Sequence, residues 1–280
     1  SSCKVFLSVL KSRFCYLLCC SLYLVILAGN MVINLVILLD ATLHKSMYFF
    51  LKNLPVLELI YSSVTIPKII VSLLLNSKHI SIMAFATQMY LFLSLGSTES
   101  ALLTTMAYDW YVAICHPLQY PSIMNKRLCI LLAITSQTID IPAQILQTGL
   151  LFSLPFCSSN KINHIFCDPV LLLTMACSDT SVNETMIYII SAFFGLAPFS
   201  MIVVSYSSIL ITILKIPTIK GRRKTFSTCF SHLTMLALFY VSGFINYLQP
   251  KSKILPDTDK LLCLFYTVFP AILNPFIYSL

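Results

Sequence analysis

The sequence predicts an all-α membrane protein, a seven-transmembrane helix bundle, from two observations. Hydrophobic residues make up 58% of the chain and charged residues only 10%, whereas a soluble domain carries about 25% charged residues. Too little polar surface is therefore available to cover a water-soluble globule of 280 residues. Apolar stretches longer than about 18 residues recur along the chain, and each can cross a hydrocarbon layer roughly 30 Å thick.

The apolar stretches define the expected helices in order. The first contains no charged residue, and the second, third and fourth hold isolated charges. The fifth and sixth contain no Asp, Glu, Lys or Arg, and the seventh is charged only at Asp259 and Lys260, where it begins. We expect one domain over residues 1–280, because no linker or internal repeat divides it. Both termini are expected to be truncated, since the chain starts at Ser1 without a methionine and stops within the last span. The spans lie at about residues 16–39, 47–75, 80–113, 128–150, 186–214, 226–248 and 259–280.

Basic residues set the expected orientation. The segment Lys215–Lys224 holds five basic residues and no acid, and loops of this kind remain in the cytosol. Lys45 and the pair Lys126–Arg127 fall on the same side. The five basic residues of Lys215–Lys224 outweigh the three before the first span, which argue for the opposite orientation. The N-terminus is therefore expected outside and the C-terminus in the cytosol. The net charge of +8 is explained by this excess of basic residues on the inner side, where they are attracted to anionic lipid. It does not indicate nucleic-acid binding.

Four polar side chains lie deep within spans one, two, three and seven: Asn30, Glu58, Glu99 and Asn274. Ionisable groups at membrane depth are costly, so each needs a partner. If the four converge, their oxygen atoms would hold Na⁺, or the two carboxyls would share a proton. The alternative is a hydrogen-bonded network that joins the helices without an ion.

Span four carries a polar stripe. Gln137, Asp140, Gln144 and Gln147 recur at spacings of three and four residues, which places them on one helical face. We expect that face to point into the bundle. An unpaired Asp140 near mid-membrane would cost about 2.5–3.5 kcal/mol, and the sequence names no partner for it.

The longest loop, between about residues 151 and 185, lies outside and contains Cys157, Cys167 and Cys177. An extracellular compartment permits disulfides, and three cysteines leave one in need of a partner elsewhere. The glycosylation sequon that begins at Asn183 lies too near the fifth span for use. His164 and Cys167 supply only two metal ligands, which is too few for a site. No metal is therefore expected.

Seven motifs in order resemble one family, the vertebrate olfactory receptors, a branch of the rhodopsin-like G-protein-coupled receptors. The resemblance covers about residues 16 to 280. The motifs are GN at Gly29–Asn30, LHKSMYFFLKNL at Leu43–Leu54, SVTIPK at Ser63–Lys68, MAYDWYVAICHPL at Met106–Leu118, SY at Ser205–Tyr206, GRRKTFSTCFSHL at Gly221–Leu233 and LNPFIY at Leu273–Tyr278.

The resemblance implies a multi-pass receptor of the plasma membrane that binds a small volatile odorant among the outer helix halves. The implied site is apolar with a few hydroxyls, as suits such a ligand. The outer half of helix three holds no acid, which disfavours an amine ligand. By position, the ligand-binding residues are Phe92, Leu93, Gly96, Ser97, Ser191, Phe194, Gly243, Phe244 and Tyr247.

The resemblance also implies a switch that signals to a heterotrimeric G protein of the olfactory stimulatory type. Lys224 begins the basic inner end of helix six, which is expected to move outward when the G protein docks. Such a motion is a population shift that a ligand biases through differential affinity. By position, the switch residues are Asp109, Trp110, Tyr111, Tyr206, Lys224, Asn274, Pro275 and Tyr278.

Four positions depart from the family pattern. Trp110 stands where the family has Arg and lacks the charge and the donor fork of a guanidinium. Phe85 replaces the cysteine that bridges to the middle cysteine of the long loop, so the resemblance implies a disulfide between Cys157 and Cys177 and leaves Cys167 without its usual partner. Gln137 and Asp140 replace a Trp and a Gly, and the proline before the LNP motif is displaced to 270.

These departures keep alternatives open. One is a decayed or coupling-defective receptor copy. Another is an ion-coupled transporter that uses Glu58 and Glu99, although transporters often show internal repeats and this sequence shows none. An enzyme is not expected, because the spans hold no nucleophile–base pair at a suitable spacing. We expect no cofactor other than Na⁺ at Glu58 and Glu99.

Overall fold

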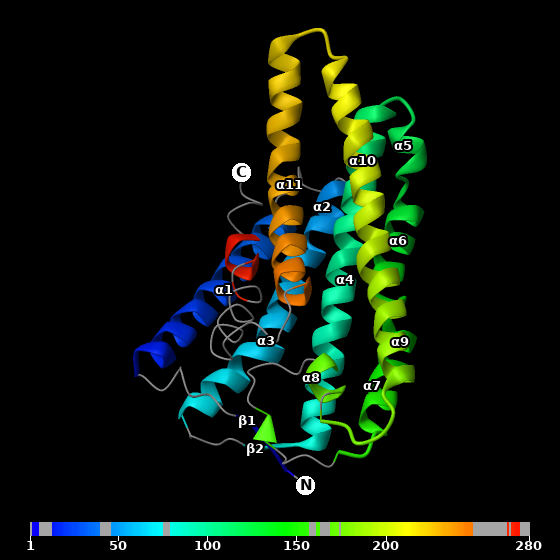
Figure 1. Cartoon of the computed structure of the whole chain (residues 1–280). Coiled ribbons are helices and arrows are strands. Elements are labelled where there is room, and N and C mark those ends of the chain that lie inside the picture. The colour runs from blue at the N-terminus through cyan, green and yellow to red at the C-terminus, as the bar shows by residue number, and fades with distance from the viewer. Residues whose placement is uncertain are drawn as a thin grey trace.

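The structure, a computed structural model, is an elongated helical bundle (Figure 1). It describes residues 2–5, 13–39, 46–74, 79–156, 161–162, 169–173, 175–248, 268 and 270–274. The described helices are α1 (Arg13–Leu39), α2 (Ser46–Leu51), α3 (Asn53–Leu74), α4 (Ile82–Cys115), α5 (Tyr120–Ile123), α6 (Lys126–Thr138), α7 (Ile141–Phe152), α8 (Pro169–Leu173), α9 (Ser181–Ser191), the π-helical segment η2 (Ala192–Leu196), α10 (Ala197–Leu214) and α11 (Ile219–Leu248).

These helices account for the expected spans. α1, α4 and α11 each correspond to one span, whereas α2–α3, α6–α7 and α9–η2–α10 each build one span from consecutive pieces. Of the seventh span, residues 268 and 270–274 are described. Among the described residues, four segments have the length and hydropathy needed to cross a membrane: Tyr16–Leu39, Phe49–Val71, Lys126–Phe152 and Ser181–Leu214.

The two ends of the bundle separate the loops as the basic residues predict. α5 and the loop between α10 and α11 lie at one end, and β1, β2 and α8 lie at the other (Figure 1). The N-terminal strand is thus on the side opposite the basic segment Lys215–Lys224. We refer to the end with the basic segment as the inner end.

α4 is the central helix. It packs against α2, α3, α6, α7, α10 and η2. At 34 residues it is about 50 Å long, since an α-helix rises 1.5 Å per residue, and it therefore contacts its neighbours from the outer to the inner end. The largest cluster of buried apolar residues includes Leu102, Leu103 and Met106 of α4, with Ile209 of α10 and Phe50 of α2.

Apolar side chains also cover the outside of the bundle. Leu24 and Leu39 on α1 and Tyr188 and Val204 on α9 and α10 are each at least 65% exposed. In water such a surface would aggregate, but in a bilayer it faces hydrocarbon while the helices satisfy their own backbone hydrogen bonds.

The fourth span differs from its prediction, because its helix is interrupted. α6 ends at Thr138 and α7 begins at Ile141, with Pro142 in its first turn. The prediction that all four polar residues point into the bundle assumed one uninterrupted helix, and it was wrong for Gln137. That side chain is exposed on the outside of the bundle, where its Nε2 donates to Asn53 Oδ1 at 3.2 Å, while Asp140, Gln144 and Gln147 are buried.

A small sheet at the outer end was not predicted. Its strand order is β2–β1–β3, with β1 (Ser2–Val5) between β2 (His79–Ser81) and β3 (Lys161–Ile162). β1 is antiparallel to β2, with Cys3 opposite Ile80, and parallel to β3. The strands are too short and too distant in sequence for a period-two pattern to identify them.

Phe85 occupies the outer end of α4, where the family keeps a bridging cysteine. It is 3% exposed and packs with Met89, Leu151 and Leu172 in one apolar cluster. Its ring lies edge-on to that of Phe152 at a centroid distance of 5.9 Å. Apolar packing among α4, α7 and α8 therefore joins the outer loop to the bundle at this position.

Candidate functional site

The polar side chains of spans one, two and seven meet in the middle of the bundle. Asn274 Nδ2 donates to Glu58 Oε1 at 2.5 Å. Asn30 Nδ2 donates to the carbonyls of Ile26 and Ala271 at 3.0 and 3.3 Å. Glu99 on α4 is also buried. The structure thus pairs Glu58 with Asn274 and joins Asn30 to the backbone of the seventh span.

One acceptor in this polar centre has no hydrogen bond. Asn30 Oδ1 is buried and has no partner among the described residues, while the Asn30 side chain is 0% exposed. An unsatisfied buried oxygen is costly, so a cation, a water molecule or a protonated carboxyl beside it would be stabilised.

The outer half of α4 carries the first group of predicted ligand residues. Phe92 is buried, and its ring lies 5.2 Å from that of Tyr61 on α3. Leu93, Gly96 and Ser97 are half-buried. A methyl group added at Gly96 would meet no atom of the described residues within 4 Å, so the described structure leaves open space beside this position.

The predicted residues of helices five and six are placed less completely. Ser191 ends α9 and is exposed, whereas Phe194 lies in η2 and is half-buried beside Phe193. η2 contacts α4, and π-helical segments of this kind occur often at functional sites. Gly243, Phe244 and Tyr247 belong to α11, but their side chains lie outside the described part of the chain.

A hydrogen-bonded network joins α4 to α7 behind this face. Ser94 Oγ donates to Asp140 Oδ2 at 2.7 Å, which supplies the partner that the sequence did not reveal. Gln144 Nε2 donates to Ser97 Oγ at 3.1 Å, and Ser97 Oγ in turn donates to the Leu93 carbonyl at 3.1 Å. Gln144 of the fourth span (α7) thus fixes the orientation of Ser97, a predicted ligand residue on α4.

A second contact at this level was missed from the sequence. Ser100 and Tyr240 share a hydrogen bond of 2.8 Å between α4 and α11. The Tyr240 ring lies 5.1 Å from that of Phe199 on α10. A buried tyrosine generally needs a hydrogen-bond partner. The presence of Tyr240 in an apolar span could therefore have indicated a polar contact with another helix.

The inner end of α4 shows how Asp109 is satisfied beside Trp110. Tyr120 of α5 donates its hydroxyl to Asp109 Oδ1 at 2.9 Å. Trp110 is half-buried and packs against the large apolar cluster. Tyr111 hydrogen-bonds His116 Nε2 at 3.1 Å. Tyr120 was not predicted, because nothing in the local pattern marks a tyrosine of the second inner loop as a partner.

A buried hydrogen bond joins α10 and α11, the helices of the fifth and sixth spans. The Tyr206 hydroxyl lies 2.5 Å from His232 Nδ1, and both side chains are buried. Tyr206 was a predicted switch residue, but its partner His232 was not identified. The Lys224 side chain and residues 275 and 278 lie outside the described part of the chain.

The outer loop is ordered against α7 by its backbone. Cys177 N–H donates to the Pro155 carbonyl at 3.0 Å, and Phe156 forms an antiparallel bridge with Ala176. Cys177 is in a disulfide, but Cys157 and Cys167 lie outside the described residues, so the predicted pairing stays a prediction. Asn183 of the sequon is 6% exposed within α9, which leaves no room for a glycan.

The acid before α9 lies outside the membrane. Asp179 Oδ1 accepts hydrogen bonds from the Ser181 hydroxyl and from the Ser181 backbone N–H, the latter at 3.0 Å. These donors hold the pKa of Asp179 below its ordinary value. The charged carboxylate therefore remains at the start of α9, where the helix dipole favours it.

The fold is that of a rhodopsin-like seven-helix bundle, with polar pairs along its central helix. The crystal structure of squid rhodopsin superposes with a TM-score of 0.75 at 16% sequence identity, covering 94% of this chain and 75% of that one. The seven-transmembrane bundle predicted from the sequence is thereby confirmed.

The sequence comparisons give the family. The model of the olfactory receptor family matches residues 19–280. Human olfactory receptor 10AG1 is 48% identical over 259 residues, 92% of this chain and 86% of that protein. Mouse olfactory receptor 2A7 is 45% identical, over 92% of this chain and 83% of that protein. The chain belongs to the olfactory receptor family and is a multi-pass protein of the plasma membrane.

The bond between Ser94 and Asp140 yields a prediction about stability. Ser94→Ala leaves the Asp140 carboxyl without its donor, so it should destabilise the bundle more in the wild type than in an Asp140→Ala background. We expect a coupling energy of about 0.6–1.7 kcal/mol, the range for such bonds in membranes. A double-mutant cycle on the thermal unfolding of the purified protein measures it.

Ser153→Ala is the matched control. Ser153 is exposed beyond the end of α7 and bonds only its own helix among the described residues. Its replacement should leave the unfolding temperature unchanged. Strictly additive effects of Ser94→Ala and Asp140→Ala would show that the two side chains do not interact.

Proposed function

We propose that this chain detects a small, mostly apolar volatile molecule between the outer halves of α4, η2 and α11. The single observation that carries the proposal is the outer half of α4, where a buried aromatic ring, Phe92, and an oriented hydroxyl, Ser97, lie five residues apart. Membership of the olfactory receptor family supports the same ligand class.

The network behind this face supports the proposal physically. Ligand sites combine apolar walls with a few well-placed polar groups. The Ser97 hydroxyl donates to the Leu93 carbonyl and accepts from Gln144, so its second lone pair remains able to accept from a ligand hydroxyl. Phe92 supplies apolar contact. An alcohol with a hydrocarbon body fits these two features.

The inner half of the bundle supports coupling to a heterotrimeric G protein, which we propose is of the olfactory stimulatory type. The contacts between α4 and α5 and between α10 and α11, through Asp109–Tyr120 and Tyr206–His232, hold this end closed. Outward movement of α11 would have to break the second contact. Family membership and fold favour this receptor function over the transporter alternative.

We further propose that the polar centre binds Na⁺. Glu58, Glu99 and Asn274 supply oxygen atoms, the ligands that hard cations prefer, and Asn30 Oδ1 is unsatisfied within the described structure. Two neighbouring carboxylates at membrane depth would be stabilised by a cation, or would share a proton in its absence.

The ligand site is tested by the response of transfected cells to a panel of volatile aliphatic alcohols. Phe92→Ala should raise the half-maximal concentration of a responding alcohol about tenfold or more, because burying an aromatic side chain contributes about 1.5–3 kcal/mol. Phe193→Ala is the control, since Phe193 is 59% exposed on the outside of η2. Equal responses of both variants at equal surface density would refute the proposed position.

Trp110 should limit the signal. An arginine there offers charged donors worth about 1.5–3 kcal/mol each, so Trp110→Arg should raise odorant-evoked cyclic AMP about tenfold at matched surface density. Trp110→Phe, which keeps the apolar packing without adding charge, is the control and should not raise it. An arginine variant that reaches the surface and signals no better would show that coupling is limited elsewhere.

Sodium binding predicts a cation-specific gain in stability. At a tenfold excess of Na⁺ over its Kd, the unfolding free energy should rise by about 1.4 kcal/mol relative to choline. Glu99→Gln should abolish that gain, whereas Glu184→Gln, at an exposed position of α9, should retain it. Equal stability in Na⁺ and choline, combined with dependence on pH, would instead indicate a shared proton.

A further inference from the structure

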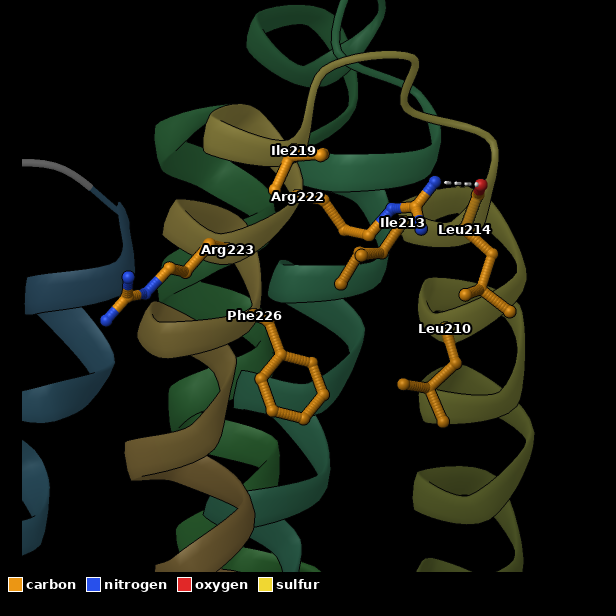
Figure 2. Close-up of a pocket in the computed structure, with 7 residues that line it drawn as sticks. All are labelled: Leu210, Ile213, Leu214, Ile219, Arg222, Arg223 and Phe226. Atoms are coloured by element: carbon orange, nitrogen blue, oxygen red, sulfur yellow. Dashed lines mark hydrogen bonds between the residues drawn. The ribbon is translucent and has the colours of Figure 1, made fainter.

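A cavity of about 380 Å³ lies at the inner end of the bundle between α10 and α11. Its volume falls within the roughly 300–1,000 Å³ of small-molecule sites. The wall is apolar, and Leu210 of α10 and Phe226 of α11 face each other across it (Figure 2). The lining residues are Leu210, Ile213, Leu214, Ile219, Arg222, Arg223 and Phe226.

The cavity opens toward the outside of the bundle. Leu214 is 65% exposed, Ile219 84% and Phe226 45%, while Ile213 at its base is 2% exposed. In a membrane these exposed side chains adjoin lipid. A hydrocarbon chain entering from the bilayer would therefore meet apolar surface throughout.

Arg222 stands at the inner rim of this cavity. Its Nη2 atom donates to the carbonyls of Leu214 and Ile216 at 3.0 and 3.2 Å, as Figure 2 shows for Leu214. A guanidinium has five donors, and no hydrogen bond within the described structure uses Nε or Nη1 of Arg222. In contrast, the Arg223 guanidinium points away from the cavity (Figure 2).

The turn before α11 holds Arg222 in this position. A Cβ atom added to Gly221 would lie 2.7 Å from Thr218 Oγ1 and 3.3 Å from Ile216 Cγ2. A larger residue here would displace the Thr218 side chain, so glycine favours the close approach of the loop to the first turn of α11. That approach brings the Ile216 carbonyl within reach of Arg222.

We propose that this cavity binds one anionic phospholipid of the cytoplasmic leaflet, with an acyl chain between Leu210 and Phe226 and the phosphate on Arg222. Charge complementarity favours this occupant. Lys215, Lys220 and both arginines are exposed, and the segment Lys215–Lys224 contains no acid. Basic pockets between helices at the cytoplasmic side attract anionic headgroups, whereas an apolar peptide would leave Arg222 without a counter-charge.

The bound lipid would also act on the switch. It would contact α10 and α11 together, the two helices that Tyr206 and His232 join. If the separation of these helices changes on activation, the lipid would bind the two states with different affinity and so shift their populations. The proposal does not depend on the identity of the odorant.

The test is native mass spectrometry of the full chain in neutral detergent, titrated with palmitoyl-oleoyl phosphatidylserine or palmitoyl-oleoyl phosphatidylcholine. The phosphatidylserine Kd should be about fivefold lower than that of phosphatidylcholine, the preference expected from one basic residue near the headgroup. Arg222→Gln should remove the preference. Lys220→Gln, which removes a neighbouring exposed charge that does not line the cavity, should preserve it.

Leu214→Trp provides a second variant, which fills the cavity from its exposed side and leaves the core intact. It should weaken binding of both lipids at least fivefold. Glycerophosphoserine, which lacks acyl chains, should not compete. Equal loss in Arg222→Gln and Lys220→Gln would show diffuse attraction to the basic loop and overturn the proposal. So would competition by glycerophosphoserine, or loss of G-protein activation in Leu214→Trp with lipid binding unchanged.

Discussion

The structure depends on one constraint: polar groups buried at membrane depth must find their partners inside the protein. α4 meets it along its whole length by hydrogen bonds to its neighbours. Ser94 bonds Asp140, Ser100 bonds Tyr240 and Asp109 accepts from Tyr120. Because hydrocarbon offers little hydrophobic drive between helices, such bonds and close packing hold membrane bundles together. They also connect the outer face to the inner end.

The same constraint explains how the departures from the family pattern are accommodated. Phe85 fills an apolar cluster in place of a bridging cysteine. Asp140 accepts a hydrogen bond from Ser94, and Gln137 donates one to Asn53 on the outer surface of the bundle. Trp110 packs on the core, so it is tolerated in the fold although it cannot supply the charge of an arginine.

The sequence predicted the spans, their orientation and the family, because hydropathy, charge bias and motifs are local patterns. It singled out Glu58 and Asn274 as buried polar residues, and the structure joins them by a hydrogen bond. It did not predict the interruption of the fourth span before Ile141. It also missed the partners Ser94 and His232, because these lie 46 and 26 positions from Asp140 and Tyr206. The ligand residues of helix six stay predictions, since their side chains lie outside the described structure.

The most direct test of this account is an experimental structure of the full-length chain in lipid nanodiscs, resolved well enough to place side chains along α4. The account predicts Ser94 within hydrogen-bond distance of the Asp140 carboxylate, and the Tyr120 hydroxyl on Asp109. An Asp140 side chain turned toward lipid, or an Asp109 paired with a different helix, would contradict the central role assigned to α4.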